Sequence, residues 1–342
     1  MFTKNDAWHR DGVEKIASNT YRIPLPLPEE GLAAVNTYAL VDDSGVVLID
    51  AGADTDASRA ALQSGLNSFG CTLRDIRRIL VTHLHYDHFA QAIALREDFG
   101  CAVELGIGEK EGVIDLVQAP VRMPHHLALR LRTGGLDTEV NALVHRNETL
   151  DNARWELPDV WLEHASRVEV GAGRVLVARN TPGHTRGHVV YHEPESGLLF
   201  SGDHLLPTIT PSVGFEPVPA RYPLRDYMQS LQQMLELGDC RVLPAHGASD
   251  STSHERVREM FDHHADRLEL IQQTVETLGT ATALDCAELL PWRSRDVAFG
   301  TLQGLDRLLA VSETLAHLDV LVDDGGLSRL LDGDTWRYTR AG

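Results

Sequence analysis

The stretch Thr82-His83-Leu84-His85-Tyr86-Asp87-His88 carries the strongest functional signal in this 342-residue chain. It follows an apolar run, Ile79-Leu80-Val81, which is typical of a buried strand. The next segment, residues 89–95, is typical of a helix and should end near Gly100. Three imidazoles and one carboxylate therefore occupy six positions of a tight loop between strand and helix. Such nitrogen and oxygen donors bind zinc and similar divalent ions, so the stretch predicts a metal site at a strand's carboxyl end.

The order of the donors in this loop suggests two ions rather than one. The side chains of alternate residues in an extended segment point the same way, so His83 and His85 can bind one ion. Asp87 and His88 follow the turn and can face a second ion. A lone loop histidine is ordinarily a polar surface residue, but four donors in six positions are not explained in that way.

Four further short motifs repeat the pattern of a donor residue close to an apolar, strand-like run. They are Ile49-Asp50-Ala51-Gly52, Thr181-Pro182-Gly183-His184-Thr185, Phe200-Ser201-Gly202-Asp203 and Leu243-Pro244-Ala245-His246-Gly247. Together with the first stretch, and in this order, they resemble the signature of the metallo-β-lactamase-fold hydrolases. The matched motifs span residues 48–247, which makes the resemblance specific.

The resemblance implies a fold and a set of metal ligands. The expected fold is of the α+β class, a four-layer αββα sandwich. One ion would be bound by His83, His85 and His184, the other by Asp87, His88 and His246, and Asp203 would bridge both. Asp50 would lie behind the ligands without binding metal itself. We expect two zinc ions, although iron or manganese also suits nitrogen and oxygen donors of this kind.

The implied activity is hydrolysis by a hydroxide held between the two ions, with Asp87 as the catalytic residue that orients it and takes up its proton. The expected substrate is a thioester such as an acyl-CoA or a glutathione conjugate, as in glyoxalase II. A lactonase or a phosphodiesterase, including a nuclease of the β-lactamase-like protein 2 branch, stays open as an alternative. A regulatory protein with structural metals is disfavoured, because structural sites are normally closed and mononuclear.

Two sister families fit the motifs less well. The flavodiiron redox proteins have Glu where this chain has His85, which disfavours electron transfer. Secreted β-lactamases lack a bridging carboxylate such as Asp203 and carry a signal peptide. The first residues of this chain are charged and show no apolar core of a signal, so that role is also disfavoured.

The amino-acid composition limits the cellular compartment and the binding partners that we expect for this protein. The chain has 31 Lys plus Arg against 50 Asp plus Glu, a formal net charge of −19, which disfavours nucleic acid as a partner. Its apolar runs fall short of the roughly 18 residues that a membrane span needs. The four cysteines form no Cys-x-x-Cys pair and are expected to be reduced thiols of a cytoplasmic protein. We expect a small-molecule substrate and no membrane partner, and a homodimer stays open.

The sequence predicts two domains, residues 1–250 and 251–342. Within the first, residues 104–166 exceed what a compact fold needs and are predicted to form a helical lid. The lid contains Arg122, Arg130 and Arg132, which either clamp an anionic substrate tail or form a solvated helix face. His204 follows Asp203 directly and is a weaker candidate for substrate binding, because neighbours on a strand point to opposite sides.

The second domain begins with an amphipathic helix within residues 257–278 and continues into a small winged-helix-like unit over residues 280–342. Two short helices and a hairpin at the turn Asp332-Gly333-Asp334 suggest that unit. Winged helices often bind DNA, but residues 251–342 hold nine Arg and no Lys against sixteen Asp plus Glu, which gives 9 − 16 = −7. This sign disfavours DNA binding, and we interpret the unit as a packing or dimerising module.

Overall fold

Two β-sheets form the centre of the molecule, and the computed structural model describes residues 8–10, 12–27, 32–119, 121, 123–146, 155–292 and 297–342. The first sheet has seven strands in the order β1-β2-β3-β4-β5-β6-β7. Their bounds are Glu14–Ala17, Thr20–Pro26, Ala34–Asp42, Gly45–Ile49, Ile76–Val81, Ala102–Gly106 and Val160–Leu162. The pairs from β4 to β7 are parallel and those from β1 to β4 antiparallel, so β4, β5, β6 and β7 end at the same edge.

The second sheet has five strands in the order β12-β11-β10-β9-β8. Their bounds, from β8 to β12, are Arg167–Gly171, Arg174–Asn180, Val189–Glu193, Leu198–Gly202 and Arg241–Pro244. Only the β11–β12 pair in this sheet is parallel, so these two strands also end side by side. Both sheets therefore place several carboxyl strand ends at a common edge, and loops that follow such ends are well placed to build a site.

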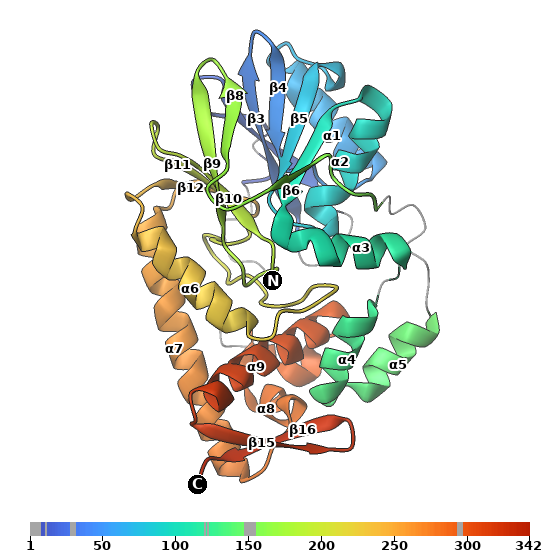
Figure 1. The fold of residues 1–342 in the computed structure, drawn as a ribbon, viewed down its shortest axis with the longest axis vertical. Helices are drawn as coiled ribbons and strands as arrows, with labels where there is room; N and C mark the ends of the chain where they lie inside the picture. The colour runs from blue at the N-terminus through green and yellow to red at the C-terminus, as the bar shows by residue number, and fades with distance from the viewer. Residues whose placement is uncertain are drawn as a thin grey trace.

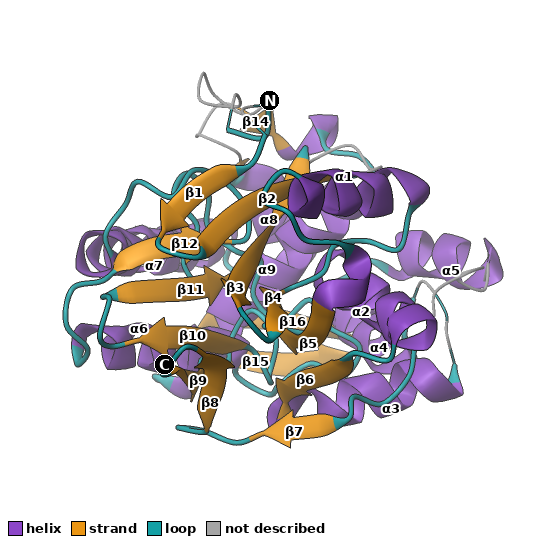
Figure 2. Cartoon of the chain, turned by 90° about the horizontal axis from the view of Figure 1, so that it is seen from above, coloured by secondary structure: helices purple, strands orange, loops and turns teal. Residues whose placement is uncertain are grey.

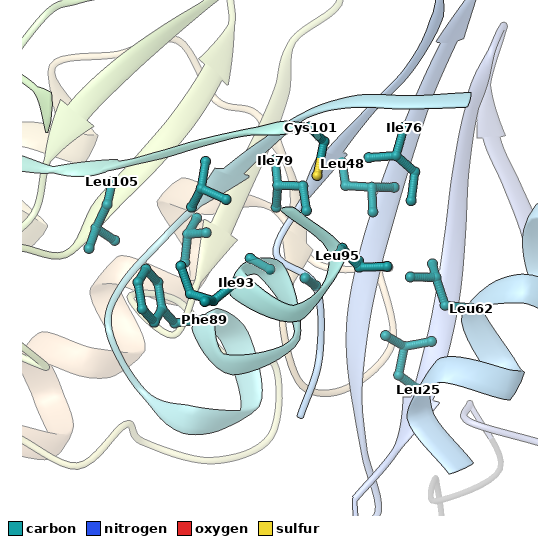
Figure 3. Packing of buried hydrophobic residues seen from close by; sticks show 14 of the residues in the cluster. Leu25, Leu48, Leu62, Ile76, Ile79, Phe89, Ile93, Leu95, Cys101 and Leu105 are labelled. Carbon is teal, nitrogen blue, oxygen red and sulfur yellow. The ribbon is translucent and has the colours of Figure 1, made fainter. Parts of the chain in front are cut away.

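The alternation of side chains along each strand divides the core into layers. In β4, Val47 and Ile49 belong to the core between the two sheets, whereas Val46 and Leu48 face the helices on the other side. Those helices are α1 (Asp56–Asn67) and α2 (Tyr86–Phe99), whose Leu62, Phe89 and Ile93 complete that outer core (Figure 3). Every second residue points the same way in a strand, so an apolar run buries both faces of the sheet.

Helices α6 (Pro223–Leu235) and α7 (Ser253–Leu278) cover the outer face of the second sheet. Leu199 of β11 packs there with Leu231 of α6 and Val257 of α7. Figure 2 shows the strands of both sheets between α6 and α7 on one side and α1 and α2 on the other. The four-layer αββα arrangement expected from the resemblance is confirmed.

The helix that follows the main motif has clear start and stop signals. His85 precedes α2 in an extended conformation, and Asp87 lies in its first turn, where a carboxylate interacts well with the helix dipole. Gly100 ends the helix with φ 76°, a conformation that glycine adopts without the steric cost of a side chain. The motif therefore lies at a defined junction between β5 and α2.

One expectation about the first sheet is wrong. Pro24, Pro26 and Pro28 interrupt the alternating pattern of the sequence and predict a loop, yet β2 continues through the first two of them to Pro26. Pro28 lies outside the described residues. Pro24 pairs with Asn36 and Pro26 with Ala34 of β3, while β1 accompanies β2 only as far as Arg22. Among the described residues, no strand pairs with the edge of β2 beyond Arg22, so the missing proline N–H groups interrupt no strand pairing there.

The segment predicted as a lid has a mixed structure. It contains α3 (Lys110–Gln118), α4 (His125–Thr133) and α5 (Asp137–Arg146), and it ends by adding β7 to the first sheet. The apolar residues of α4 and α5 pack into a cluster with the C-terminal helices, through Leu127, Leu131 and Val140. Helices α4 and α5 are thereby joined to the last third of the chain.

The C-terminal part consists of helices and two short β-ribbons. It contains α7, α8 (Ala283–Leu289), the pair β13 (Pro291–Trp292) and β14 (Val297–Ala298), α9 (Leu305–Asp323) and the hairpin β15 (Leu327–Asp332) and β16 (Thr335–Arg340). In Figure 1, α8, α9, β15 and β16 lie together with α4 and α5 below the two sheets. The helices and hairpin expected from the sequence are present, while the winged-helix assignment and the boundary at residue 250 stay predictions.

Two further expectations concern cysteines and membranes. All four cysteines are free thiols, and Cys101, Cys240 and Cys286 are buried. Within the described part of the chain, every helix is too short or too polar to cross a lipid bilayer.

Candidate metal centre

Seven donor side chains meet at the carboxyl ends of four strands. The loop after β5 supplies four of them, and the loops after β9, β11 and β12 supply one each. They are His83, His85, Asp87 and His88 after β5, His184 after β9, Asp203 after β11 and His246 after β12. Segments up to 163 residues apart in the chain thus converge because both sheets present these ends at one edge.

Three histidines form the first group of donors. His184 Nε2 lies 3.2 Å from His83 Nε2 and 3.0 Å from His85 Nδ1. Asp203 Oδ2 lies 3.5 Å from the same nitrogen of His184. The three imidazole nitrogens lie within 4.8 Å of one another, which is close enough for one ion to contact all of them.

The second group consists of Asp87, His88 and His246. Asp87 Oδ2 lies 3.4 Å from His246 Nε2 and 3.6 Å from His88 Nε2. The other carboxylate oxygen of Asp203, Oδ1, lies 3.5 Å from His246 Nε2 and 3.8 Å from His88 Nε2. Asp203 therefore presents one oxygen to each group.

Hydrogen bonds on the far side of the rings fix the tautomers of three histidines. His85 Nε2 donates to the Phe215 carbonyl at 3.0 Å, His184 Nδ1 to that of Ser212 at 2.7 Å, and His246 Nδ1 to that of Ala34 at 2.9 Å. A carbonyl oxygen can only accept, so each of these nitrogens carries the proton. In the neutral ring the opposite nitrogen, which faces the site, then carries a bare lone pair.

Asp50 and Thr82 orient the remaining two histidines. His88 Nδ1 donates to Asp50 Oδ2 at 2.9 Å, and the Thr82 backbone N–H donates to Asp50 Oδ1 at 2.8 Å. The Thr82 hydroxyl donates to the same carboxylate, 3.0 Å from Oδ2, and can accept from His83 Nδ1 at 3.0 Å. Asp50 thus contacts His88 directly and His83 through the Thr82 hydroxyl.

The donor set fits divalent metal ions. His88 Nε2, His246 Nε2 and Asp203 Oδ1 are buried and have no hydrogen-bond partner among the described residues. Buried polar atoms without partners are costly, and bare lone pairs 3.0–3.2 Å apart in the first group repel one another. A cation among them removes both penalties. Ligands at the ~2.0–2.1 Å typical of zinc–nitrogen bonds in a tetrahedron lie about 3.4 Å apart, close to the spacing observed.

The two groups differ in their electrostatics. Burial lowers the pKa of His85 to about 4 and that of His83 well below its usual range, aided by the neighbouring histidines. Burial acts in the same direction on His88, but Asp87, Asp50 and Asp203 outweigh it and raise the pKa of His88 to about 10. The first group therefore presents neutral rings, whereas the second is dominated by carboxylates and attracts positive charge.

His188, which the sequence interpretation did not single out, positions Asp203. The Asp203 backbone N–H donates to His188 Nε2 at 3.1 Å, and the other ring nitrogen lies 2.8 Å from the Thr181 hydroxyl. Gly202 adopts φ 50°, and a Cβ there would lie 2.7 Å from His188 Nε2. The only signal in the sequence was a second histidine four positions after His184.

Glu109 is a second residue that the sequence did not reveal. Its fully buried carboxyl accepts from the Thr185 hydroxyl, next to His184, and from the backbone of Leu84, between His83 and His85. It thereby ties together the two loops that build the first group of donors. Burial, with Glu216 nearby, raises the pKa of Glu109 to about 8.

Three of the four remaining candidates for substrate binding lie in the described residues, and each contacts a partner other than the seven donors. Arg130 pairs with Asp319 at 3.0 Å, Arg132 donates to Asn141 at 2.6 Å, and Arg122 lies outside the described residues. His204 is fully buried, and its ring packs edge-on against Tyr227 at 5.2 Å. A role in substrate binding stays a prediction for all four.

Comparison with protein families and curated proteins gives matches over most of the chain. Residues 31–246 match the model of the metallo-beta-lactamase superfamily. A probable metallo-hydrolase of Bacillus subtilis is 26% identical over 330 residues, covering 92% of this chain and 95% of that protein. A beta-lactamase-like protein 2 homologue of Caenorhabditis elegans is 27% identical over 304 residues, covering 86% and 85%. A hydroxyacylglutathione hydrolase of Fuscovulum blasticum is 31% identical over 172 residues, or 49% of each chain.

A solved structure extends the similarity to the whole fold. A metallo-beta-lactamase family protein from Thermus thermophilus superposes with a TM-score of 0.73 at 28% identity. The superposition covers 95% of this chain and 100% of the other. The C-terminal elements therefore belong to the shared architecture together with the sandwich.

Proposed function

The chain belongs to the metallo-beta-lactamase superfamily, and from this premise we propose that it is a thioester hydrolase that uses two divalent metal ions. The observation that carries the proposal is the position of Asp203, whose two oxygens face separate groups of donors. One group contains three imidazoles, and the other contains two imidazoles and one carboxylate. Two adjacent ions joined by a carboxylate are an arrangement used in hydrolysis.

His83, His85 and His184 would hold one ion, Asp87, His88 and His246 the other, and Asp203 would contact both. When bound, such ions make hydroxide available near neutral pH and polarise the carbonyl oxygen of a substrate. We propose zinc, and iron or manganese would also suit the nitrogen and oxygen donors.

Asp87 is the residue proposed to handle the proton. Its side chain is 23% exposed, whereas that of His88 is fully buried. Burial opposes ionisation, but His88 and His246 hold the pKa of Asp87 far below its usual range. The carboxylate is therefore a hydrogen-bond acceptor at neutral pH. It can orient an attacking water by accepting its O–H, while so low a pKa means that it holds a proton only in passing.

Three considerations favour a thioester over other substrates of this chemistry. The similarity to a hydroxyacylglutathione hydrolase points to cleavage of a carbonyl–sulfur bond. The net charge of −19 disfavours long polyanions such as RNA, whose phosphates the surface repels. A thioester also needs no strong acid at the leaving group, because a thiolate is a stable leaving group near neutral pH.

A substrate panel tests this function. Metal-replete protein is assayed with an acyl-CoA, an S-acylglutathione, a small thioester, a lactone, a phosphodiester and a short RNA. The proposal expects the highest kcat/KM on one of the thioesters, with loss of that activity in Asp87→Asn. A lactone or phosphodiester cleaved faster than every thioester would overturn the thioester assignment while leaving metal-dependent hydrolysis intact.

A further inference from the structure

A second hollow lies outside the metal centre, where α4 meets the C-terminal part of the chain. Its volume is about 340 Å³. Its walls come from α4, from the loop at residues 218–221 ahead of α6, from α9 and from the hairpin β15–β16. Figure 1 shows α4, α9 and this hairpin side by side. The hollow is therefore built from segments distant in sequence.

The charges that line this hollow are mainly positive. The lining contains three guanidinium groups and one carboxylate. They belong to Arg130, Arg221, Arg329 and Asp319. Three minus one leaves a surplus of two positive charges, before His126 at the rim is counted. The whole chain has a net charge of −19, so a cationic hollow stands out as a place where an anion would bind.

Asp319 holds two of the arginines in place without saturating them. Arg130 Nη2 donates to Asp319 Oδ2 at 3.0 Å, and Arg329 Nη1 donates to Asp319 Oδ1 at 2.6 Å. The Asp319 side chain is only 5% exposed, and Arg329 also lies over the Trp336 ring at 4.5 Å. A guanidinium has five N–H donors, so each arginine keeps donors for a ligand. Arg130 Nε is buried without a hydrogen-bond partner among the described residues.

Arg221 supplies a cation that no carboxylate of the described residues neutralises. Its guanidinium lies 5.0 Å from the Tyr222 ring, and no carboxylate pairs with it in the described ranges. Planar guanidinium groups with fixed orientation suit the oxygens of a phosphate. A phosphate monoester carries about −1.5 to −2 charges at neutral pH, which matches the surplus, whereas each carboxylate of a glutathione conjugate carries one.

The rest of the wall is apolar, with Leu129, Pro219 and Leu315 among its side chains. An inorganic anion would leave these groups in water. A ligand that combines phosphate with a larger organic body uses the cations and the apolar wall together. The nucleotide end of coenzyme A is a ligand of that type.

The hollow lies within reach of the metal centre. The Phe215 carbonyl accepts from His85 Nε2, and Val218, three residues later, lines the hollow. A chain advances at most ~3.3–3.6 Å per residue, so the two Cα positions are no more than about 11 Å apart. Arg130 also lies close enough to Glu216 to influence its ionisation. The two places are therefore close enough for one extended ligand to span the distance between them.

We propose that this hollow binds the phosphate-bearing end of an acyl-CoA substrate, an inference that rests on the proposed thioesterase function and names its substrate class. The binding energy would come from Arg130, Arg221 and Arg329. Such remote contacts position the thioester carbonyl without taking part in bond cleavage.

The test separates binding from hydrolysis. Titration calorimetry with coenzyme A as the probe compares the metal-replete wild type with Arg221→Gln and the charge reversal Arg221→Glu. Arg221 is exposed, so both variants should fold. We expect Arg221→Gln to weaken coenzyme A binding about ten-fold or more, as for a lost charged hydrogen bond, and Arg221→Glu to weaken it further. The matched control is Arg337→Gln on the same C-terminal hairpin, which pairs with Asp332 and does not line the hollow.

Kinetics provide the second readout. The ratio of kcat/KM for acyl-CoA to that for a small thioester without phosphates should fall about ten-fold or more in Arg221→Gln, through KM. The ratio for S-acylglutathione should not follow it. Equal affinity for coenzyme A in wild type, Arg221→Gln and Arg337→Gln would overturn the inference, even if thioesters are cleaved. The protein could instead bind coenzyme A in a way that depends on Arg221 and yet cleave no thioester. That result would overturn the proposed function but would support the phosphate-binding site.

Discussion

Asp50 shows how much of the site depends on a residue that binds no metal in this account. It follows β4 with φ 58°, a left-handed conformation that is uncommon outside glycine. Its two carboxylate oxygens accept from the Thr82 backbone, the Thr82 hydroxyl and His88 Nδ1. Through these contacts one buried carboxylate fixes the orientation of ligands in both groups.

The substitution Asp50→Asn tests this role. Asparagine tolerates the left-handed conformation, so the backbone should be retained while the negative charge is lost. We expect metal affinity to fall about 10- to 100-fold, the usual cost of removing a partner behind a metal ligand. Competition with a chromogenic chelator measures the change. Asp43→Asn, at the exposed turn between β3 and β4, is the control. Equal affinities in the two variants would show that Asp50 does not support the ligands.

At the scale of elements, helix α4 packs firmly against the C-terminal part of the chain. Its Leu131 is fully buried in a cluster with Leu308 and Leu315 of α9. Arg130 pairs with Asp319 of α9 on the same side. The helix is therefore held by both apolar contacts and an ion pair with a segment almost two hundred residues later in the chain.

Truncation of α4 side chains measures this coupling. Leu131→Ala should lower the free energy of unfolding by about 2–5 kcal/mol, because it leaves a cavity in a buried cluster. Leu129→Ala, on the same helix but 47% exposed, should change it by about 0.5 kcal/mol or less. Urea unfolding followed by tryptophan fluorescence gives both values. If the two variants are equally stable, α4 is not part of the C-terminal core.

Helices α7 and α9 meet through a buried pair of histidines. His317 Nδ1 donates to the Glu313 carbonyl at 2.8 Å, and His264 Nδ1 donates to His317 Nε2 at 3.2 Å. Burial lowers the pKa of His317 to about 3 and that of His264 well below its usual range. The charged or titratable groups around the pair are Arg267 and His263 of α7, Glu313 of α9 and Tyr227 of α6.

This pair predicts acid sensitivity. The unfolded chain protonates these histidines below a pH of about 6.5, whereas the folded protein resists protonation of His317 down to about 3. Stability is therefore unaffected above the unfolded pKa and falls as the pH drops through this window, by up to ~1.4 kcal/mol per pH unit for each histidine. In His317→Gln the loss between pH 7.5 and 5.5 should be smaller than in wild type. Unfolding curves with the same pH dependence in both proteins would contradict the interpretation.

Local patterns in the sequence were sufficient for most of the elements and for placing the seven donor residues next to strand ends. Strand, loop and helix signals around the motif placed His83 to His88 at a strand end, and periodicity predicted the helix α7 almost to its ends. Periodicity shows which face of a helix is buried but not which partner covers it. The contact between α4 and α9, the position of Glu109 and the pairing of Arg130 all depend on long-range packing, and no local signal announces them.

At the scale of the whole molecule, helices α7 and α9 of the C-terminal part pack against the second sheet of the sandwich. Val257 and Met260 of α7, together with Ala316 of α9, pack in one cluster with Leu199 and Val242 of the second sheet. The metal centre lies at the edge of that sandwich, and the cationic hollow lies where α4 meets α9. The same packing that supports the second sheet therefore also shapes the proposed site for the substrate tail.

The measurement that tests the central claim most directly is the metal content of the purified protein, determined beside its rate of thioester hydrolysis. With two groups of donors joined by Asp203, about two divalent ions per chain should be found by elemental analysis. Removal of the ions by a chelator should abolish hydrolysis, and their return should restore it. His83→Ala should lose at least one ion and most of the activity. Full thioesterase activity in a preparation free of metal would contradict the account.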